Sequence, residues 1–216
     1  MYSTSVSDSL SALARAISKE HMASLPIRRY EGPVCVVSTQ HDLDRAREDI
    51  GREHVVGFDT ETRPAFAKGE FYLPCLVQVA TARGVYLFQF REIEVKPLLR
   101  ALLEDTHTIK VGVSLANDVR TLKEVFAFEP RSMLDLGRVA RRHGFAQTGV
   151  RNLAGIFLTC RIPKGAQTSN WAVPRLTPQQ ITYAATDAWI CRELYLKFAT
   201  LGMDLAGTEP AIGEGH

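Results

Sequence analysis

The sequence of 216 residues predicts a mixed α/β fold, in which helices cover a β-sheet. Residues 54–61 are rich in β-branched and aromatic side chains, which is typical of a strand packed on both faces. Residues 73–80 and 85–90 form two further apolar stretches, and the turn between them is too short for a parallel crossover, so they predict an antiparallel hairpin. From residue 95 onward helical and strand patterns alternate, as in a mixed sheet with helices on its faces.

Composition and charge set wide limits on function. The chain is 45% hydrophobic and 23% charged, and its length suits one domain with a well-buried core. Its formal net charge of +2 permits a polyanionic partner without arguing for one. The four cysteines are far apart and form no zinc-type cluster, so we expect them to be reduced. Without an apolar run of about 20 residues or a signal-peptide pattern, the expected location is cytoplasmic, with no membrane contact.

Residues 1–30 are expected to form a helical extension of the main domain. Leu10, Leu13, Ala14 and Ile17 recur at helical spacing. Leu25-Pro26 ends this helix, because a proline disfavours helical geometry in the preceding residue. We expect the helix to pack on the domain or on a second copy of the chain, which makes a homo-oligomer one hypothesis.

The main domain is expected over residues 31–202. Thr39 or Ser38 can cap its first helix, and Thr177-Pro178 begins its last one. Alanines at 184, 185 and 188 would let that last helix approach a neighbouring strand closely. Besides the hairpin and the strand at 54–61, the expected elements are strands at 34–37, 108–113 and 133–136 and helices at 42–50, 95–104, 114–126, 138–143, 151–158 and from 178 onward.

Two segments between these elements are predicted to be ordered loops. Residues 62–69 follow directly after two acids and are well placed to touch a substrate. Residues 162–177 form a long loop of a kind that is often functional. Trp171 within it is either a packing anchor or a contact to a base, and packing is the favoured interpretation. Residues 203–216 are expected to form a disordered tail.

Two acids stand near the end of the strand at 54–61. Asp59 and Glu61 are two residues apart, so their side chains project to the same side of the strand. Two such acids repel each other and lose hydration unless a cation lies beside them, and a divalent metal with oxygen ligands meets that need. They can equally mark the end of the strand, where a loop begins. This stretch alone favours neither interpretation.

Two further acids lie at helix positions. Asp118 falls in the first turn of a helix, where the helix dipole favours an anion, so a structural role explains it when it is taken singly. Tyr183 and Asp187 are four residues apart and share one face of the last helix. Each acid is easily explained alone, but the combination of four is harder to dismiss as structural.

Three short motifs resemble those of a known family. Phe58-Asp59-Thr60-Glu61, Asn117-Asp118 and Tyr183-Ala184-Ala185-Thr186-Asp187 are similar to the three exonuclease motifs of the DEDD superfamily, and more closely to its ribonuclease D and Werner-syndrome exonuclease branch. The resemblance covers about residues 33–200. Tyr-x-x-x-Asp is typical of the subgroup with a catalytic tyrosine. Supporting matches lie at 76–79, 169–171 and 176–180.

This resemblance implies a ribonuclease-H-like exonuclease fold, a mixed sheet with one antiparallel strand flanked by helices. It also implies two ions, Mg²⁺ or Mn²⁺, and the release of nucleoside 5′-monophosphates from the 3′ end of DNA or RNA. Asp59 would bridge both ions, and Glu61 and Asp187 would hold the ion that binds the attacking water. Asp118 would support the second ion. Tyr183 would orient the water, because a tyrosine with a pKa of about 10 is a poor base at neutral pH.

The sequence also proposes substrate contacts and leaves alternatives open. A non-catalytic nucleic-acid-binding module on the same fold is one alternative, but decayed members of such families typically lose a ligand, and this chain keeps all four acids and the tyrosine. An endonuclease is another, which the Tyr-x-x-x-Asp motif argues against. Because the chain stops soon after the last motif, we expect a stand-alone exonuclease domain. The candidate substrate contacts are Thr60, Asn117, Arg120, Arg151, Lys164 and Asn170.

Overall fold

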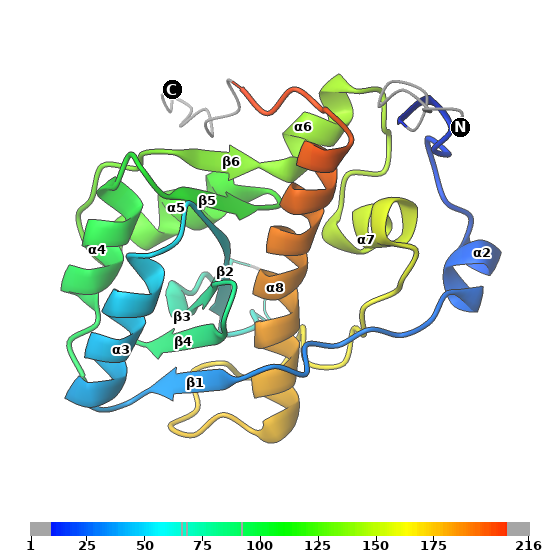
Figure 1. Ribbon diagram of the computed structural model, residues 1–216. Helices are drawn as coiled ribbons and strands as arrows, with labels where there is room; N and C mark the ends of the chain where they lie inside the picture. The colour runs from blue at the N-terminus through cyan, green and yellow to red at the C-terminus, as the bar shows by residue number, and fades with distance from the viewer. Residues whose placement is uncertain (1–9, 66, 68, 92, 207–216) are drawn as a thin grey trace.

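The computed structural model describes residues 10–206, apart from 66, 68 and 92, and contains one six-stranded sheet in the order β1-β4-β3-β2-β5-β6 (Figure 1). The strand β3 is antiparallel to both of its neighbours, and the remaining pairs are parallel. This topology confirms the prediction of a mixed sheet with one antiparallel strand. The strands are β1 (Val34–Val37), β2 (Val55–Thr62), β3 (Pro74–Ala80), β4 (Val85–Gln89), β5 (Ile109–Gly112) and β6 (Met133–Asp135).

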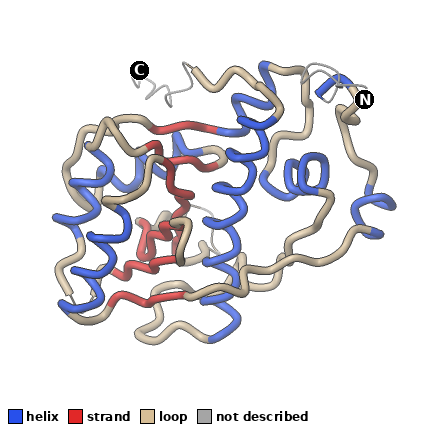
Figure 2. Tube along the Cα trace, in the orientation of Figure 1, coloured by secondary structure: helices blue, strands red, loops and turns tan. Residues whose placement is uncertain are grey.

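Helices cover both faces of this sheet, as Figure 2 shows by colour. The helices α3, α4 and α5 bury their apolar residues against one face, and α6, α7 and α8 bury theirs against the other. Within the described ranges, no helix combines the length and apolar character needed to cross a membrane. The helices are α2 (Lys19–Ser24), α3 (Gln40–Ile50), α4 (Lys96–Glu104), α5 (Leu115–Lys123), α6 (Leu136–Arg142), α7 (Val150–Leu158) and α8 (Pro178–Thr200).

The predicted start signals of two helices are present. Thr39 caps α3 and forms a capping box with Asp42. Thr177 caps α8 in the same way with Gln180, and proline follows at the first helical position. These caps satisfy backbone N–H groups that have no partner inside the helix, so they define where each helix begins.

The close approach of α8 to β2 is the contact that places the candidate site. Gly57 faces α8, and a Cβ atom built on it would lie 1.9 Å from the carbonyl oxygen of Ala188. Ala184, Ala185 and Ala188 are all fully buried, as their predicted role in close packing requires. Because side chains alternate along a strand, Gly57 shares its face with Asp59 and Glu61, so α8 lies over the acidic end of β2.

The N-terminal segment differs from the predicted single long helix. Among described residues, the helix α2 covers only Lys19–Ser24, and Ser18 caps it by accepting a hydrogen bond of 3.1 Å from the backbone N–H of His21. Ile17 is buried in the core, and its N–H donates 2.9 Å to the Gln147 side chain. Tertiary contacts with the main domain therefore override the helical spacing. Residues 1–9 of the predicted extension lie outside the described residues.

The start of the predicted tail is also ordered. Met203 is 4% exposed and packs in the same core cluster as Ile17. The Arg142 guanidinium donates to the carbonyl oxygens of Asp204 at 3.0 Å and Ala206 at 2.8 Å. The order thus extends a few residues past the predicted boundary, and residues 207–216 lie outside the described range.

We expect Gly57→Ala to destabilise the fold, because the new methyl group would meet the Ala188 carbonyl and push α8 away from β2. Overpacking of this kind costs about 1–3 kcal/mol. Thermal unfolding of the metal-free protein measures the effect. Gly149→Ala is the control, since a Cβ there meets nothing within 4 Å. Equal unfolding midpoints for the two variants would show that α8 does not depend on this close approach.

Candidate active site

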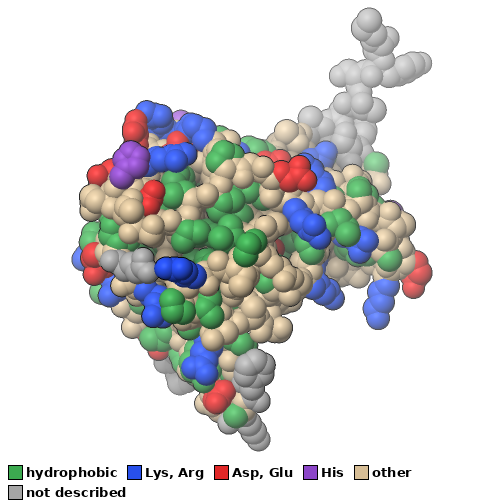
Figure 3. Space-filling view, turned by 90° about the horizontal axis from the view of Figure 1, so that it is seen from below, with side chains coloured by type: hydrophobic (Ala, Val, Ile, Leu, Met, Phe, Trp, Pro, Cys, Tyr) green, Lys and Arg blue, Asp and Glu red, His purple; other side chains and the backbone are tan. Residues whose placement is uncertain are grey.

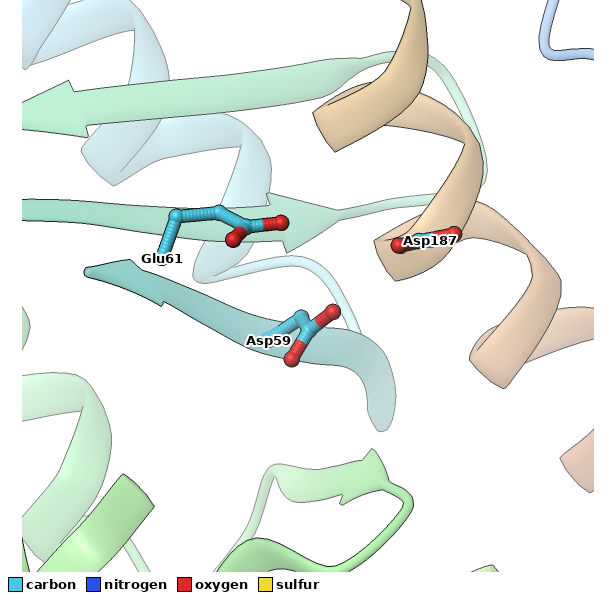
Figure 4. Close-up of side chains that lie close together, drawn as sticks. All are labelled: Asp59, Glu61 and Asp187. Atoms are coloured by element: carbon cyan, nitrogen blue, oxygen red, sulfur yellow. The ribbon is translucent and has the colours of Figure 1, made fainter. Parts of the chain in front are cut away.

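Three carboxylates converge between β2 and α8 (Figure 4). Asp59 and Glu61 project from β2 toward Asp187 on α8, and one ligand oxygen from each lies within 4.8 Å of the others. Asp187 is only 6% exposed, whereas the two β2 acids are half-buried. The period-two geometry of the strand and the packing of α8 thus bring together three acids that are distant in sequence.

The three acids of this cluster have no matching cation. Within the described part of the chain, no ion pair includes any of the three carboxylates. Burial and then the neighbouring acids raise the pKa of Asp59 well above its usual value and that of Glu61 to about 10. Burial likewise raises the pKa of Asp187 to about 6. The cluster therefore has a strong electrostatic need for a cation.

The donor set fits a divalent metal. Carboxylate oxygens are the hard ligands that Mg²⁺ and Mn²⁺ prefer. Gln78 lies directly across the β2–β3 ladder from Asp59, is fully buried, and finds no hydrogen-bond partner for either amide atom among the described residues. Burying an amide without a hydrogen-bond partner costs free energy of folding. A polar ligand beside Asp59 could supply the missing hydrogen bond to Gln78.

Asp118 lies beside this cluster rather than in it. Its Oδ1 accepts a hydrogen bond of 2.6 Å from the Thr60 hydroxyl. Thr60 alternates with the two β2 acids and so points toward α5, which carries Asp118. Burial raises the pKa of Asp118 to about 6, against the lowering effect of the Thr60 hydrogen bond. The fourth predicted acid is therefore linked to β2 through Thr60.

Tyr183 stands one helical turn before Asp187 and is 7% exposed. Burial, followed by the charges of Asp187 and Glu61, raises the pKa of its phenol. A hydrogen bond between the phenol and Asp187 lowers the pKa of the carboxyl group. Tyr183 is thus a neutral donor at physiological pH. Trp171 is fully buried with its ring centre 5.8 Å from that of Tyr183, which confirms its predicted role as a packing anchor.

A cavity of about 300 Å³ opens over these groups. Thr60 and Arg151, two of the predicted substrate contacts, line it together with Tyr183. The Arg151 guanidinium donates 3.2 Å to the Gln167 side chain, and its charge lowers the pKa of Asp187. Its Nε atom is buried without a hydrogen-bond partner among the described residues. Arg151 is therefore a cation held at the edge of an anionic centre.

Four other predicted contacts do not line this cavity. Asn117 and Arg120 are exposed on α5, where the Arg120 guanidinium donates 2.9 Å to the Asn117 Oδ1. The Asn170 Oδ1 accepts 3.1 Å from the backbone N–H of Ala172, so this side chain shapes its own loop. Lys164 lies on a neighbouring surface. The side chains of these four residues therefore lie outside the cavity.

Gln167 and Ser114 are two of the lining residues that sequence reasoning missed. Gln167 lies on the long loop and lines the cavity, where its side chain accepts a hydrogen bond from Arg151. No pattern in the sequence predicts this position. Ser114 has a backbone φ of 65°, a left-handed conformation that is uncommon for a residue other than glycine. A signal for Ser114 exists in its place between the buried strand β5 and Asp118. Backbone strain of this kind is typical of functional sites.

Comparisons with known proteins agree with this geometry. A family model described as 3′-5′ exonuclease matches residues 34–202. Exonuclease 3′-5′ domain-containing protein 2 of Drosophila melanogaster is 31% identical over 180 residues, which are 80% of this chain and 30% of that protein. Ribonuclease D of Haemophilus influenzae is 31% identical over 147 residues, 67% of this chain and 36% of that one. The chain thus spans about a third of the length of these two relatives.

A solved structure shares the fold. The EXO domain of Aedes aegypti Nibbler matches this chain with a TM-score of 0.71 at 22% identity. The match covers 81% of this chain and 93% of that one.

We expect the metal-free protein to lose stability as pH rises from about 4 to 6. The folded pKa of Asp187, about 6, lies above the ordinary value of 3.8, so the folded state holds more protons than the unfolded state in this window and the free energy of unfolding falls. Asp187→Asn removes this contribution. In EDTA at pH 8 the variant should therefore unfold a few degrees above the wild type, since 1 kcal/mol corresponds to about 2–4 °C at this size.

The control for this pH prediction is Asp44→Asn, because Asp44 is an exposed acid on α3 paired with Arg47. It should leave the pH dependence unchanged. A lower unfolding midpoint for Asp187→Asn than for the wild type at pH 8 in EDTA would contradict the uncompensated charge.

Divalent cations should reverse the order of the unfolding midpoints of Asp187→Asn and the wild type. At about 100 times its Kd, a ligand that binds only the folded state stabilises it by about 2.7 kcal/mol. We expect Mn²⁺ or Mg²⁺ to raise the unfolding midpoint of the wild type and of Asp44→Asn by several degrees, and that of Asp187→Asn much less. A thermal shift titration measures this. Equal shifts in all three proteins would place metal binding outside the cluster.

Proposed function

We propose that this chain, which belongs to the 3′-5′ exonuclease family, hydrolyses nucleic acid from its 3′ end and releases nucleoside 5′-monophosphates in a reaction that depends on divalent metal ions. The predicted family and ribonuclease-H-like exonuclease fold are confirmed by the family match and the solved structures. The observation that carries the proposal is the cluster of three carboxylates beside a neutral tyrosine.

The metal would be held by Asp59, Glu61 and Asp187, with Asp118 next to them through Thr60. We propose two ions, Mg²⁺ or Mn²⁺, as the family resemblance implies. When bound, such ions activate a water for attack on phosphorus and stabilise the leaving 3′ oxygen. Their positive charge would also compensate the repulsion that raises the pKa values of this cluster.

Tyr183 would orient the attacking water. Its pKa is raised by burial and by the neighbouring carboxylates, so the phenol keeps its proton and is not a base. The phenol O–H donates to Asp187, and the phenol oxygen would accept a hydrogen bond from the water. Its hydrogen bond to Asp187 fixes the direction of that carboxylate. The packing of Trp171 against the tyrosine ring limits its rotation.

Arg151 and Thr60 would hold the terminal nucleotide. Both line the cavity, and the Arg151 guanidinium is a cation that can donate charge-assisted hydrogen bonds to a phosphate or sugar oxygen. Thr60 contributes the backbone between the two β2 acids. Asn117, Arg120 and Asn170 have no part in this proposal, because they lie away from the cavity.

Degradation of matched 5′-labelled DNA and RNA oligonucleotides tests the function. With Mg²⁺ or Mn²⁺ we expect a ladder that shortens one nucleotide at a time from the 3′ end, and no products in EDTA or with Asp187→Asn. The faster substrate identifies the preferred nucleic acid. Binding of oligonucleotides without any cleavage would contradict the proposal and favour a non-catalytic binding module.

Tyr183→Phe should lower kcat by about 10²-fold, the lower end of the effect of a positioned proton donor, with little change in KM or in the unfolding midpoint. The hydroxyl is lost while the buried ring stays. Tyr195→Phe is the matched control, because Tyr195 lies on the same helix and packs in the core, away from the acids. Single-turnover cleavage rates measure the effect, and equal rates for the two variants would remove Tyr183 from the mechanism.

A further inference from the structure

A groove with a volume of about 810 Å³ runs between α2 and α7. It continues the cavity of the candidate active site, because Gly149, Val150, Arg151 and Gln167 line both. A polymer whose 3′ end lies in the cavity must leave it along some surface, and this groove is directly connected to it.

One wall of the groove comes from outside the family match. Ser18, Lys19 and Met22 line it, and they precede residue 34, where the match begins. Met22 and Ile17 pack on α7, where a Cβ built on Gly155 would lie 2.6 Å from the Met22 Cε. This N-terminal wall of the groove therefore packs closely against the main domain.

The chain that follows α2 is also fixed. The backbone N–H of Arg161 donates 3.0 Å to the Pro26 carbonyl, and the N–H of Arg28 donates 2.9 Å to the Arg161 carbonyl. The Arg161 guanidinium donates a further hydrogen bond of 3.1 Å to the Leu25 carbonyl. These contacts hold the N-terminal segment at a defined distance from α7, so the groove is part of the fold.

The groove is positively charged. Lys19, Arg151, Arg161 and Lys164 line it, and none of its described lining residues is acidic. The ammonium groups of Lys19 and Lys164 are exposed and make no hydrogen bond or ion pair with other described residues. In Figure 3, several Lys and Arg side chains lie at the end of the molecule where Figure 1 places α2, and others lie at the opposite end. The apolar lining includes Met22, Ile162 and Pro163.

We propose that this groove binds the single strand of nucleic acid that leads to the 3′-terminal nucleotide, with Lys19 and Lys164 contacting its phosphates. The inference rests on the proposed function. Cations that follow a groove and apolar surface beside them are what single-strand binding requires. Lys164 therefore serves as a substrate contact upstream of the active site, and the N-terminal segment adds affinity that the family-matched residues alone do not supply.

Equilibrium binding in EDTA tests the groove without cleavage. We would measure the fluorescence anisotropy of 5′-labelled single strands of three and twelve nucleotides. For Lys19→Glu/Lys164→Glu we expect the affinity ratio of the long to the short strand to fall on the order of tenfold. The slope of log K against log salt for the long strand should decrease by about 1.4, since each phosphate contact to a single strand contributes about 0.7.

Arg131→Glu is the control for a charge reversal outside the groove, because Arg131 is exposed and lies in the connection between α5 and β6, away from both cavities. It should keep the wild-type ratio. An unchanged ratio in the double variant, with a wild type that degrades both strands in Mg²⁺, would overturn the groove and leave the exonuclease standing. A wild type that degrades neither strand would overturn the proposed function itself.

Discussion

The repulsion among three closely spaced carboxylates is the interaction on which the rest of this structure depends. Asp59, Glu61 and Asp187 hold ligand oxygens within 4.8 Å of one another, and the folded chain supplies no ion pair for them within the described residues. The sheet and α8 impose this arrangement, because Gly57 and Ala188 allow the helix to lie directly on β2. The fold therefore keeps the three acids close together in spite of their repulsion, in an arrangement that a divalent cation can bind.

Tyr183, Arg151 and the groove beside α2 surround the cluster and differ from it in charge. Tyr183 stays protonated because it is buried beside the same acids, which suits it to orienting a water rather than removing a proton. Arg151 brings positive charge to the edge of the cavity without forming an ion pair with the acids. From there the surface continues into the groove beside α2, where cations replace carboxylates. The sign of the charge thus changes from the metal-binding centre to the surface where a phosphate backbone would lie.

The sequence was informative where local geometry decides position. Alternation along β2 was enough to put Asp59 and Glu61 on one side, and the hairpin turn and the caps at Thr39 and Thr177 follow from short-range rules. Distances across the fold could not be predicted from the residues. The hydrogen bond of Asp118 to Thr60, the outward position of Asn170 and the non-helical path around Ile17 all depend on tertiary contacts.

The central claim is that divalent metal ions held by the acidic cluster act at the scissile linkage, and sulfur substitution in that linkage tests it most directly. The measurement compares cleavage of single strands whose 3′-terminal linkage carries a phosphorothioate of either stereochemistry, in Mg²⁺ and in Mn²⁺. The account predicts that one diastereomer is cut on the order of tenfold or more slowly in Mg²⁺ and recovers in Mn²⁺, which tolerates sulfur better than the harder Mg²⁺. Equal relative rates for both diastereomers in both metals would contradict it.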